Sequence, residues 1–297
     1  MPSKALEQVI ELLRSIPPRE EMDIVQMRTD MENAALLQTI PEGIVFSPVD
    51  AADVPAEWII PEDALSDPVI LYLHGGGYVM GSINTHRAMV ARIAAASKCR
   101  ALLIDYRLAP ENPFPAAVED ATSAYRWLVN DLTISPESIA FAGDSAGGGL
   151  ALSTVMNLKE SSIALPAAIV CISAWADLAM TGESLDSKAE IDPMVKREGA
   201  AEMAKVYLAG ADPRTPLASP LYGDFSGFPP MLIQVGTAEV LLDDSVRLAD
   251  KAKKAGVDVA FNPWPDMIHV WHAFADILPE AKEAIKAIGD YISNRLK

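Results

Sequence analysis

Residues 138–159 read SIAFAGDSAGGGLALSTVMNLK, and this stretch decides the fold class of the chain. The short apolar run at 138–142 predicts a buried strand, and the Ala, Leu and Val residues that follow Ala146 predict a helix. Between them, residues 143–147 match the pattern G-x-S-x-G, which places a serine on a sharp strand-to-helix turn. The stretch therefore predicts an exposed hydroxyl at Ser145, whereas a purely structural glycine-rich turn is the alternative.

The pattern around this stretch is that of an α/β protein. Apolar runs rich in β-branched residues alternate with helical periodicity from about residue 68 onward, which predicts a mostly parallel sheet covered by helices. Two earlier runs, 43–49 and 56–60, predict antiparallel strands at the edge of the sheet. The strands are expected at 68–73, 101–106, 138–142, 167–172, 231–235 and 257–261, with helices beginning near Thr85, Ala116, Ala146, Asp243 and Leu278.

Two regions do not follow the alternation. Residues 1–40 carry apolar residues at helical spacing, such as Leu6, Val9 and Leu13, and predict two amphipathic helices. Residues 176–218 are too long for an ordinary crossover and contain their own helical pattern at 193–208. We interpret the second region as an insertion.

Composition excludes several classes of partner. The 297 residues include 24 Lys+Arg and 41 Asp+Glu, which gives a formal net charge of −17. Such a chain repels phosphate backbones and anionic lipid headgroups, so a small-molecule substrate is expected rather than nucleic acid or a membrane. The longest apolar runs, about ten residues, are too short to span a bilayer, and a cytoplasmic location is expected. Cys99 and Cys171 are too few for a disulfide framework or a thiolate metal site and are interpreted as reduced, buried thiols.

A second glycine-rich motif, His74-Gly75-Gly76-Gly77, comes directly after the strand expected at 68–73. Without Cβ atoms, such a backbone can approach a carbonyl oxygen closely and direct N–H groups at the negative charge that develops during acyl transfer. The N–H groups of Gly76, Gly77 and Ala146 are therefore the candidate oxyanion donors. His74 is interpreted as a residue that organises this loop.

Together these segments resemble the hormone-sensitive-lipase-like esterases, also called family IV. The resemblance rests on the His74 loop, on residues 106–111 (YRLAPE) with 114–116 (FPA), on the serine turn, and on Ile268-His269, in this order. It implies an α/β-hydrolase fold, serine carboxylesterase activity and a helical cap. The implied organisation is cap helices at 1–45, a catalytic domain at 46–175, a cap insertion at 176–218 and the rest of the catalytic domain at 219–297.

A serine nucleophile needs a general base, and the chain contains four histidines. His74 belongs to the glycine loop, and His86, near the start of a helix, is interpreted as structural. His269 follows the last predicted strand, where the chain order Ser, acid, His of α/β-hydrolases puts the base. His269 is therefore the candidate base, with His272 as the alternative.

The acid is expected just after the strand at 231–235. The family usually has an aspartate there, but the matching position in this chain is Glu239, which is longer by one methylene. Asp243 and Asp244 are the alternatives, although Asp243 falls where the next helix begins and is explained as an N-cap or first-turn residue. The candidate catalytic triad is thus Ser145, Glu239 and His269.

The expected function is hydrolysis of short- to medium-chain carboxylic esters through an acyl-enzyme on Ser145, without a metal or organic cofactor. The limit on chain length comes from the family resemblance alone. An amidase, lactonase or thioesterase with the same triad is the alternative within this class, and a hydrolase-fold binding protein without catalysis is the alternative outside it. The last strand, at 257–261, is expected at the edge of the sheet. Because an exposed edge strand can pair with the same strand of a second copy, a homodimer is expected.

Overall fold

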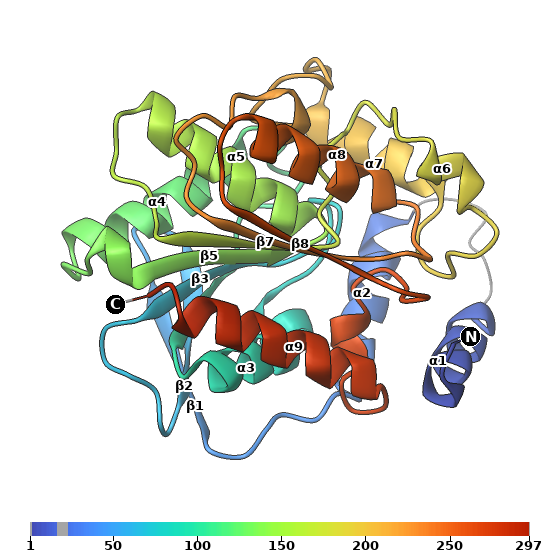
Figure 1. Ribbon diagram of the computed structural model, residues 1–297, viewed down its shortest axis with the longest axis horizontal. Coiled ribbons are helices and arrows are strands. Elements are labelled where there is room, and N and C mark those ends of the chain that lie inside the picture. The colour runs from blue at the N-terminus through green and yellow to red at the C-terminus, as the bar shows by residue number, and fades with distance from the viewer. Residues whose placement is uncertain (1, 17–22, 297) are drawn as a thin grey trace.

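The computed structural model describes residues 2–16 and 23–296. These residues form one eight-stranded sheet with helices on both faces (Figure 1). The strands are β1 (Ile44–Asp50), β2 (Pro55–Pro61), β3 (Val69–Leu73), β4 (Arg100–Ile104), β5 (Ile139–Asp144), β6 (Ala168–Ile172), β7 (Met231–Gly236) and β8 (Val259–Trp264).

The strand order is β1-β2-β4-β3-β5-β6-β7-β8. β2 is antiparallel to both β1 and β4, and every pair from β4 to β8 is parallel. The sheet is therefore mostly parallel with an antiparallel start, as the sequence predicts. β8 occupies one edge, which confirms the expected position of the last strand.

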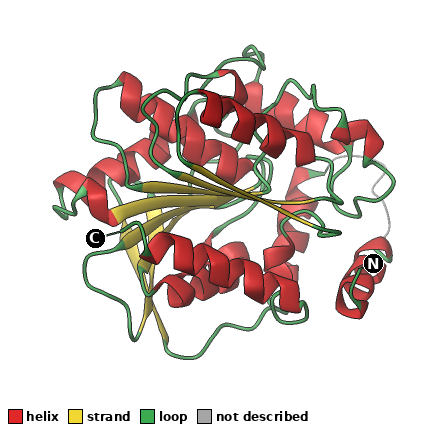
Figure 2. Cartoon of the chain, in the orientation of Figure 1, coloured by secondary structure: helices red, strands yellow, loops and turns green. Residues whose placement is uncertain are grey.

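The helices lie in two layers. Figure 2 shows helices above and below the strands, and in Figure 1 α3 and α9 lie on the face opposite α4, α5 and α8. The α-helices are α1 (Lys4–Arg14), α2 (Ile24–Ala35), α3 (Ile83–Ser97), α4 (Ala116–Asn130), α5 (Ala146–Glu160), α6 (Ser184–Ser187), α7 (Arg197–Leu208), α8 (Leu242–Lys254) and α9 (Pro279–Ser293).

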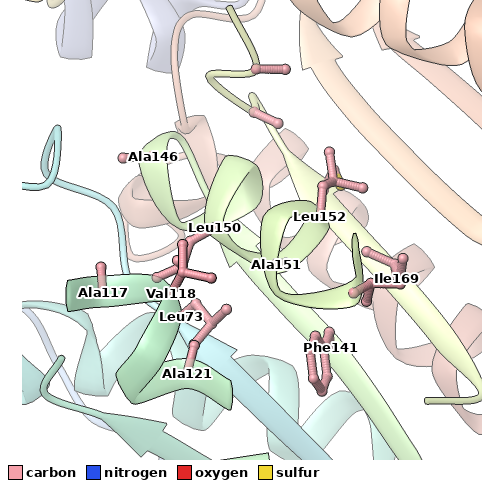
Figure 3. Packing of buried hydrophobic residues seen from close by; sticks show 14 of the residues in the cluster. Leu73, Ala117, Val118, Ala121, Phe141, Ala146, Leu150, Ala151, Leu152 and Ile169 are labelled. Carbon is pink, nitrogen blue, oxygen red and sulfur yellow. The ribbon is translucent and has the colours of Figure 1, made fainter. Parts of the chain in front are cut away.

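Alternate residues of the central strands belong to two hydrophobic cores, one on each face of the sheet. In β3, Leu71 and Leu73 belong to the core under α4 and α5, whereas Ile70 and Tyr72 belong to the core under α3 and α9. Figure 3 shows Leu150 and Ala151 of α5 packed among side chains of α4 and the sheet. Because both faces of β3, β5 and β6 are buried, these strands form continuous apolar runs in the sequence.

The insertion contains α6 and α7. The sequence predicts its helix over 193–208, but α7 begins at Arg197. The difference has a local cause: one carboxylate oxygen of Asp192 accepts hydrogen bonds from the backbone N–H groups of Met194 and Val195, which holds this segment in a turn. The predicted boundary between the N-terminal cap helices, 1–45, and the catalytic domain falls inside β1, which begins at Ile44.

No helix within residues 2–16 or 23–296 is both long enough and apolar enough to cross a membrane.

Candidate active site

Ser145 lies at the turn between β5 and α5. Its φ of 53° and ψ of −121° are unusual for a residue other than glycine, and its N–H donates to the carbonyl of Ile172, 2.8 Å away. Such a conformation costs on the order of 1–3 kcal/mol and persists only where the surroundings impose it. Ser145 is partly exposed, although every other residue from Phe141 to Leu150 is buried. The turn therefore presents the hydroxyl to an incoming molecule.

Glycine at position 147 makes this tight turn possible. A Cβ atom there would lie 2.0 Å from the carbonyl oxygen of Leu73 and 2.5 Å from that of His74. Both neighbours are backbone atoms and cannot move aside, so only glycine lets α5 pack this closely against the end of β3.

The second glycine motif forms the loop after β3. Gly76 and Gly77 have φ values of +115° and +62°, and a Cβ at Gly76 would lie 2.2 Å from the carbonyl oxygen of Met80. Within the described part of the chain, the backbone N–H groups of Gly76, Gly77 and Ala146 have no acceptor. Three free donors in this loop and at the start of α5 are what an oxyanion hole requires.

Asp144 joins this loop to the serine turn. Its buried Oδ1 accepts hydrogen bonds from the Tyr72 hydroxyl at 2.9 Å and from the Gly75 N–H at 3.2 Å. Its Oδ2 lies 3.4 Å from Nε2 of His86. Burial by itself would raise the pKa of Asp144, but His86, Tyr72 and His74 together lower it. Asp144 was not among the residues predicted from the sequence, although its place inside the serine motif was a usable signal.

His74 and His86 are buried, and both contact neighbouring groups. The buried ring of His74 stacks on Tyr106 with 4.2 Å between ring centroids, and the Tyr106 hydroxyl donates to the His74 carbonyl. Burial, together with the nearby His86, lowers the pKa of His74 to about 3, so its ring is neutral. Nδ1 of His86 lies 2.8 Å from the hydroxyl of Thr85.

His269 and Glu239 form a buried pair. Nδ1 of His269 lies 2.6 Å from Oε2 of Glu239, whose side chain is fully buried. Because a carboxylate only accepts hydrogen bonds, the ring proton belongs on Nδ1, which leaves the lone pair of Nε2 free. Burial would lower the pKa of His269, but the hydrogen bond and charge of Glu239 raise it above the usual value. The pair has the base–acid arrangement of a catalytic triad.

Two hydrogen bonds made just after β6 place this pair at the same end of the sheet as Ser145. The Ser145 carbonyl accepts from the N–H of Trp175, and the Ser173 hydroxyl oxygen accepts from the N–H of Val270, next to His269. Both contacts are made just after β6, at the carboxyl ends of the parallel strands, where α/β proteins build their sites.

The alternative residues have other partners. His272 is fully buried, its Nε2 lies 2.7 Å from Oε1 of Gln234, and burial lowers its pKa to about 3. Asp243 lies in the first turn of α8, after the N-cap Leu241, and accepts from the N–H of Ser184 at 2.8 Å. Asp244 accepts from two backbone N–H groups at the start of the insertion. These contacts explain the three residues without a catalytic role.

Residues of α7 that were not predicted from the sequence cover residues 74–77, the candidate oxyanion loop. A Cβ at Gly77 would lie 2.4 Å from Sδ of Met203, which places this side chain directly against the loop. The ring of Tyr207 stacks on that of Tyr78, the residue after Gly77. No periodicity predicts such contacts, because they join segments far apart in the chain.

Cys99 and Cys171 are free and buried, and burial raises the pKa of the Cys171 thiol to about 12. Among the described residues, no group of three His, Cys, Asp or Glu side chains is arranged to hold a metal ion. A cavity of about 370 Å³ opens beside α2 and α3 and is lined by residues such as Leu36 and Arg87, but by none of the candidate site residues.

Comparison with known proteins identifies the family of the chain. The family described as alpha/beta hydrolase fold matches residues 70–273. An acetyl-hydrolase from Streptomyces hygroscopicus is 45% identical over 254 residues, which are 85% of this chain and 83% of that protein. An esterase from Acinetobacter venetianus is 36% identical over 252 residues, which are 84% of this chain and 82% of that esterase.

Solved structures of other proteins match this chain along its whole length. The crystal structure of an esterase from the bacterial hormone-sensitive lipase family has a TM-score of 0.96 and 46% identity, and covers 100% of both chains. The chain therefore belongs to the α/β-hydrolase fold family, among the esterases similar to hormone-sensitive lipase. The predicted family and the predicted class of enzyme, a carboxylic ester hydrolase, are both confirmed.

Proposed function

We propose that the protein hydrolyses short- to medium-chain carboxylic esters through an acyl-enzyme on Ser145. The observation that carries this proposal is the buried pair of His269 and Glu239, with 2.6 Å between Nδ1 and Oε2. It gives the serine a base whose ring is held in one orientation and whose positive form is stabilised.

In the first half of the proposed reaction, Nε2 of His269 takes the proton of the Ser145 hydroxyl while Oγ bonds to the ester carbonyl carbon. The carbonyl oxygen becomes negative and accepts hydrogen bonds from the N–H groups of Gly76, Gly77 and Ala146. His269 then gives its proton to the alkoxide that leaves, and the acyl group remains on Ser145. In the second half, His269 takes a proton from water, the hydroxide attacks the acyl carbon, and the acid leaves as Ser145 regains its proton.

We also propose that residues 1–45 and 176–218 act as a cap that encloses the acyl group. The contacts of Met203 and Tyr207 with the oxyanion loop support this role for the insertion. For the N-terminal part, Arg28 of α2 donates to the backbone carbonyls of Val79 and Ala109, close to the same loop. Residues 1 and 17–22 of this region lie outside the described residues.

A substrate series tests the reaction and the cap. We expect p-nitrophenyl esters with acyl chains of two to about eight carbons to be hydrolysed, with kcat/KM falling for longer chains. Matched amides, lactones and thioesters with the same acyl groups test the alternative activities. A faster reaction with one of these classes, or with emulsified triglyceride, would contradict the proposal.

The edge strand β8 supports a further proposal, that two copies pair there to form a homodimer. β8 has a neighbour on one side, β7, within the described chain, so its other edge is available for pairing. Light scattering at micromolar concentration should give about twice the 31.9 kDa of one chain. A mass of one chain would refute the dimer. On sequence grounds we propose a cytoplasmic location, which cell fractionation tests.

A further inference from the structure

Ser173 is a buried serine that neither sequence motif contains. It follows β6 directly, is fully buried, and has a φ of 47°, in the left-handed region that residues other than glycine rarely adopt. Its N–H donates to the carbonyl of Gln234 in β7 at 2.8 Å, which helps to hold this conformation. A strained, fully buried polar residue at the carboxyl end of a central strand calls for a functional explanation.

The hydroxyl of Ser173 contacts two loops at once. It donates to Oε1 of Glu239 at 2.8 Å, and its oxygen accepts the N–H of Val270 at 3.2 Å. Glu239 belongs to the loop after β7, and Val270 follows His269 in the loop after β8. One hydroxyl group therefore links the segments that carry the acid and the base.

The two oxygens of Glu239 have separate partners. Oε1 accepts from the Ser173 hydroxyl and from the N–H of Gly236 at 2.6 Å, whereas Oε2 faces Nδ1 of His269. Two donors on Oε1 fix the rotation of the carboxylate plane, so that Oε2 is aimed at the imidazole. Glutamate has one more rotatable bond than the aspartate usual at this position of the family, and its carboxylate needs more such restraint.

We propose that Ser173 is a positioning residue that fixes the Glu239 carboxylate and the His269 loop in the geometry required for acyl transfer. This inference rests on the proposed function, because the effect of Ser173 reaches the substrate only through Glu239 and His269. Ser173 matters for the rate of the chemical steps rather than for substrate binding.

Ser173→Ala tests the proposal, because it removes the hydroxyl and keeps the Cβ. We expect kcat for p-nitrophenyl butyrate to fall about 10- to 100-fold, with KM within about twofold of the wild type. The acid limb of the pH profile of kcat/KM should also move to lower pH, since a loosened Glu239 stabilises the protonated His269 less. Ser173→Cys, which keeps a weak donor, should recover part of kcat.

The matched control is Ser245→Ala. Ser245 is also fully buried, but its hydroxyl has no partner among the described residues, so its loss should leave kcat and the pH profile unchanged. Thermal unfolding checks that each variant is folded. If Ser173→Ala fails to fold, Ser173→Gly, which adopts a positive φ without strain, replaces it.

The outcomes separate the two proposals. A wild type without esterase activity would overturn the proposed function. An active wild type with unchanged kcat and pH profile in the folded Ser173 variant would overturn the role of Ser173 alone. A fall in kcat with an unmoved pH profile would likewise overturn it, because a purely structural loss does not act through the Glu239–His269 pair.

Discussion

The ring of Tyr207 stacks on the ring of Tyr78, with 3.8 Å between their centroids and 7° between their planes. Tyr207 belongs to α7 of the insertion, and Tyr78 follows the glycines that carry the candidate oxyanion donors. Since both rings are buried, the position of the oxyanion loop depends on how α7 docks. We therefore expect the proposed cap to position the loop of the candidate oxyanion donors, in addition to its proposed role of enclosing a substrate.

This contact predicts a graded series at position 207. Tyr207→Ala should lower kcat about 10- to 100-fold, because the loop loses the ring that supports it, and should cost about 3–5 kcal/mol of unfolding free energy. Tyr207→Phe keeps the stack and removes a buried hydroxyl without a partner in the described chain. This variant should therefore match the wild type in kcat and in the free energy of unfolding. Equal losses of kcat in the two variants would show that the stack does not position the loop.

Glu239 is expected to be the acid of the triad. Glu239→Gln should lower kcat about 10²- to 10⁴-fold, because His269 loses the charge that orients it and stabilises its protonated form. Asp243→Asn should lower kcat far less, since Asp243 accepts from the N–H of Ser184, whereas Nδ1 of His269 faces Glu239. Steady-state kinetics on the folded variants at one pH compares them, and the reverse ranking would move the acid to Asp243.

The pH dependence follows from the raised pKa of His269. Its neutral form is the base, so activity is lost below this pKa and gained as the pH rises through it. Because Glu239 raises this pKa above the usual value for histidine, about 6.5, we expect the midpoint of kcat/KM to lie above that pH. Activity that peaks near pH 4 would contradict His269 as the base.

The surroundings of Gly147, at the turn after Ser145, and of Gly199, in α7, predict opposite effects when each is replaced by alanine. Gly147→Ala should destabilise the protein by about 1–3 kcal/mol or more, because its Cβ meets the backbone of Leu73 and His74. A Cβ at Gly199 in α7 has no atom within 4 Å, so Gly199→Ala should stabilise by at most about 1 kcal/mol. Urea unfolding of both variants tests this, and a neutral Gly147→Ala would refute the close packing at the turn.

Local patterns in the sequence were sufficient to predict the sheet. The strands predicted at 138–142 and 231–235 lie within one or two residues of β5 and β7 at each end, because a strand buried on both faces is a continuous apolar run. The start of α7 could not be predicted, since it depends on how Asp192 uses its carboxylate.

Candidate site residues could be found from the sequence where a residue lies in a motif or directly follows a strand. Ser145 and Gly76 belong to motifs, and His269 and Glu239 were found from chain order. Ser173 also follows the end of a strand, which was a usable signal. Its proposed role, however, depends on a hydrogen bond to Glu239, 66 positions away in the chain. Met203 of the insertion was unpredictable for the same reason, because its contact with the oxyanion loop exists only in the folded chain.

The most direct test of the account is stoichiometric labelling with a p-nitrophenyl alkylphosphonate, measured by mass spectrometry together with ester hydrolysis. We expect the wild type to take up one phosphonate per chain on Ser145 and to lose its activity in proportion. Ser145→Ala, shown to be folded by thermal unfolding, should take up none and lose at least about 10³-fold in kcat/KM. Retained hydrolysis in the folded Ser145→Ala protein, or a label on a different residue, would contradict the claim that Ser145 is the nucleophile.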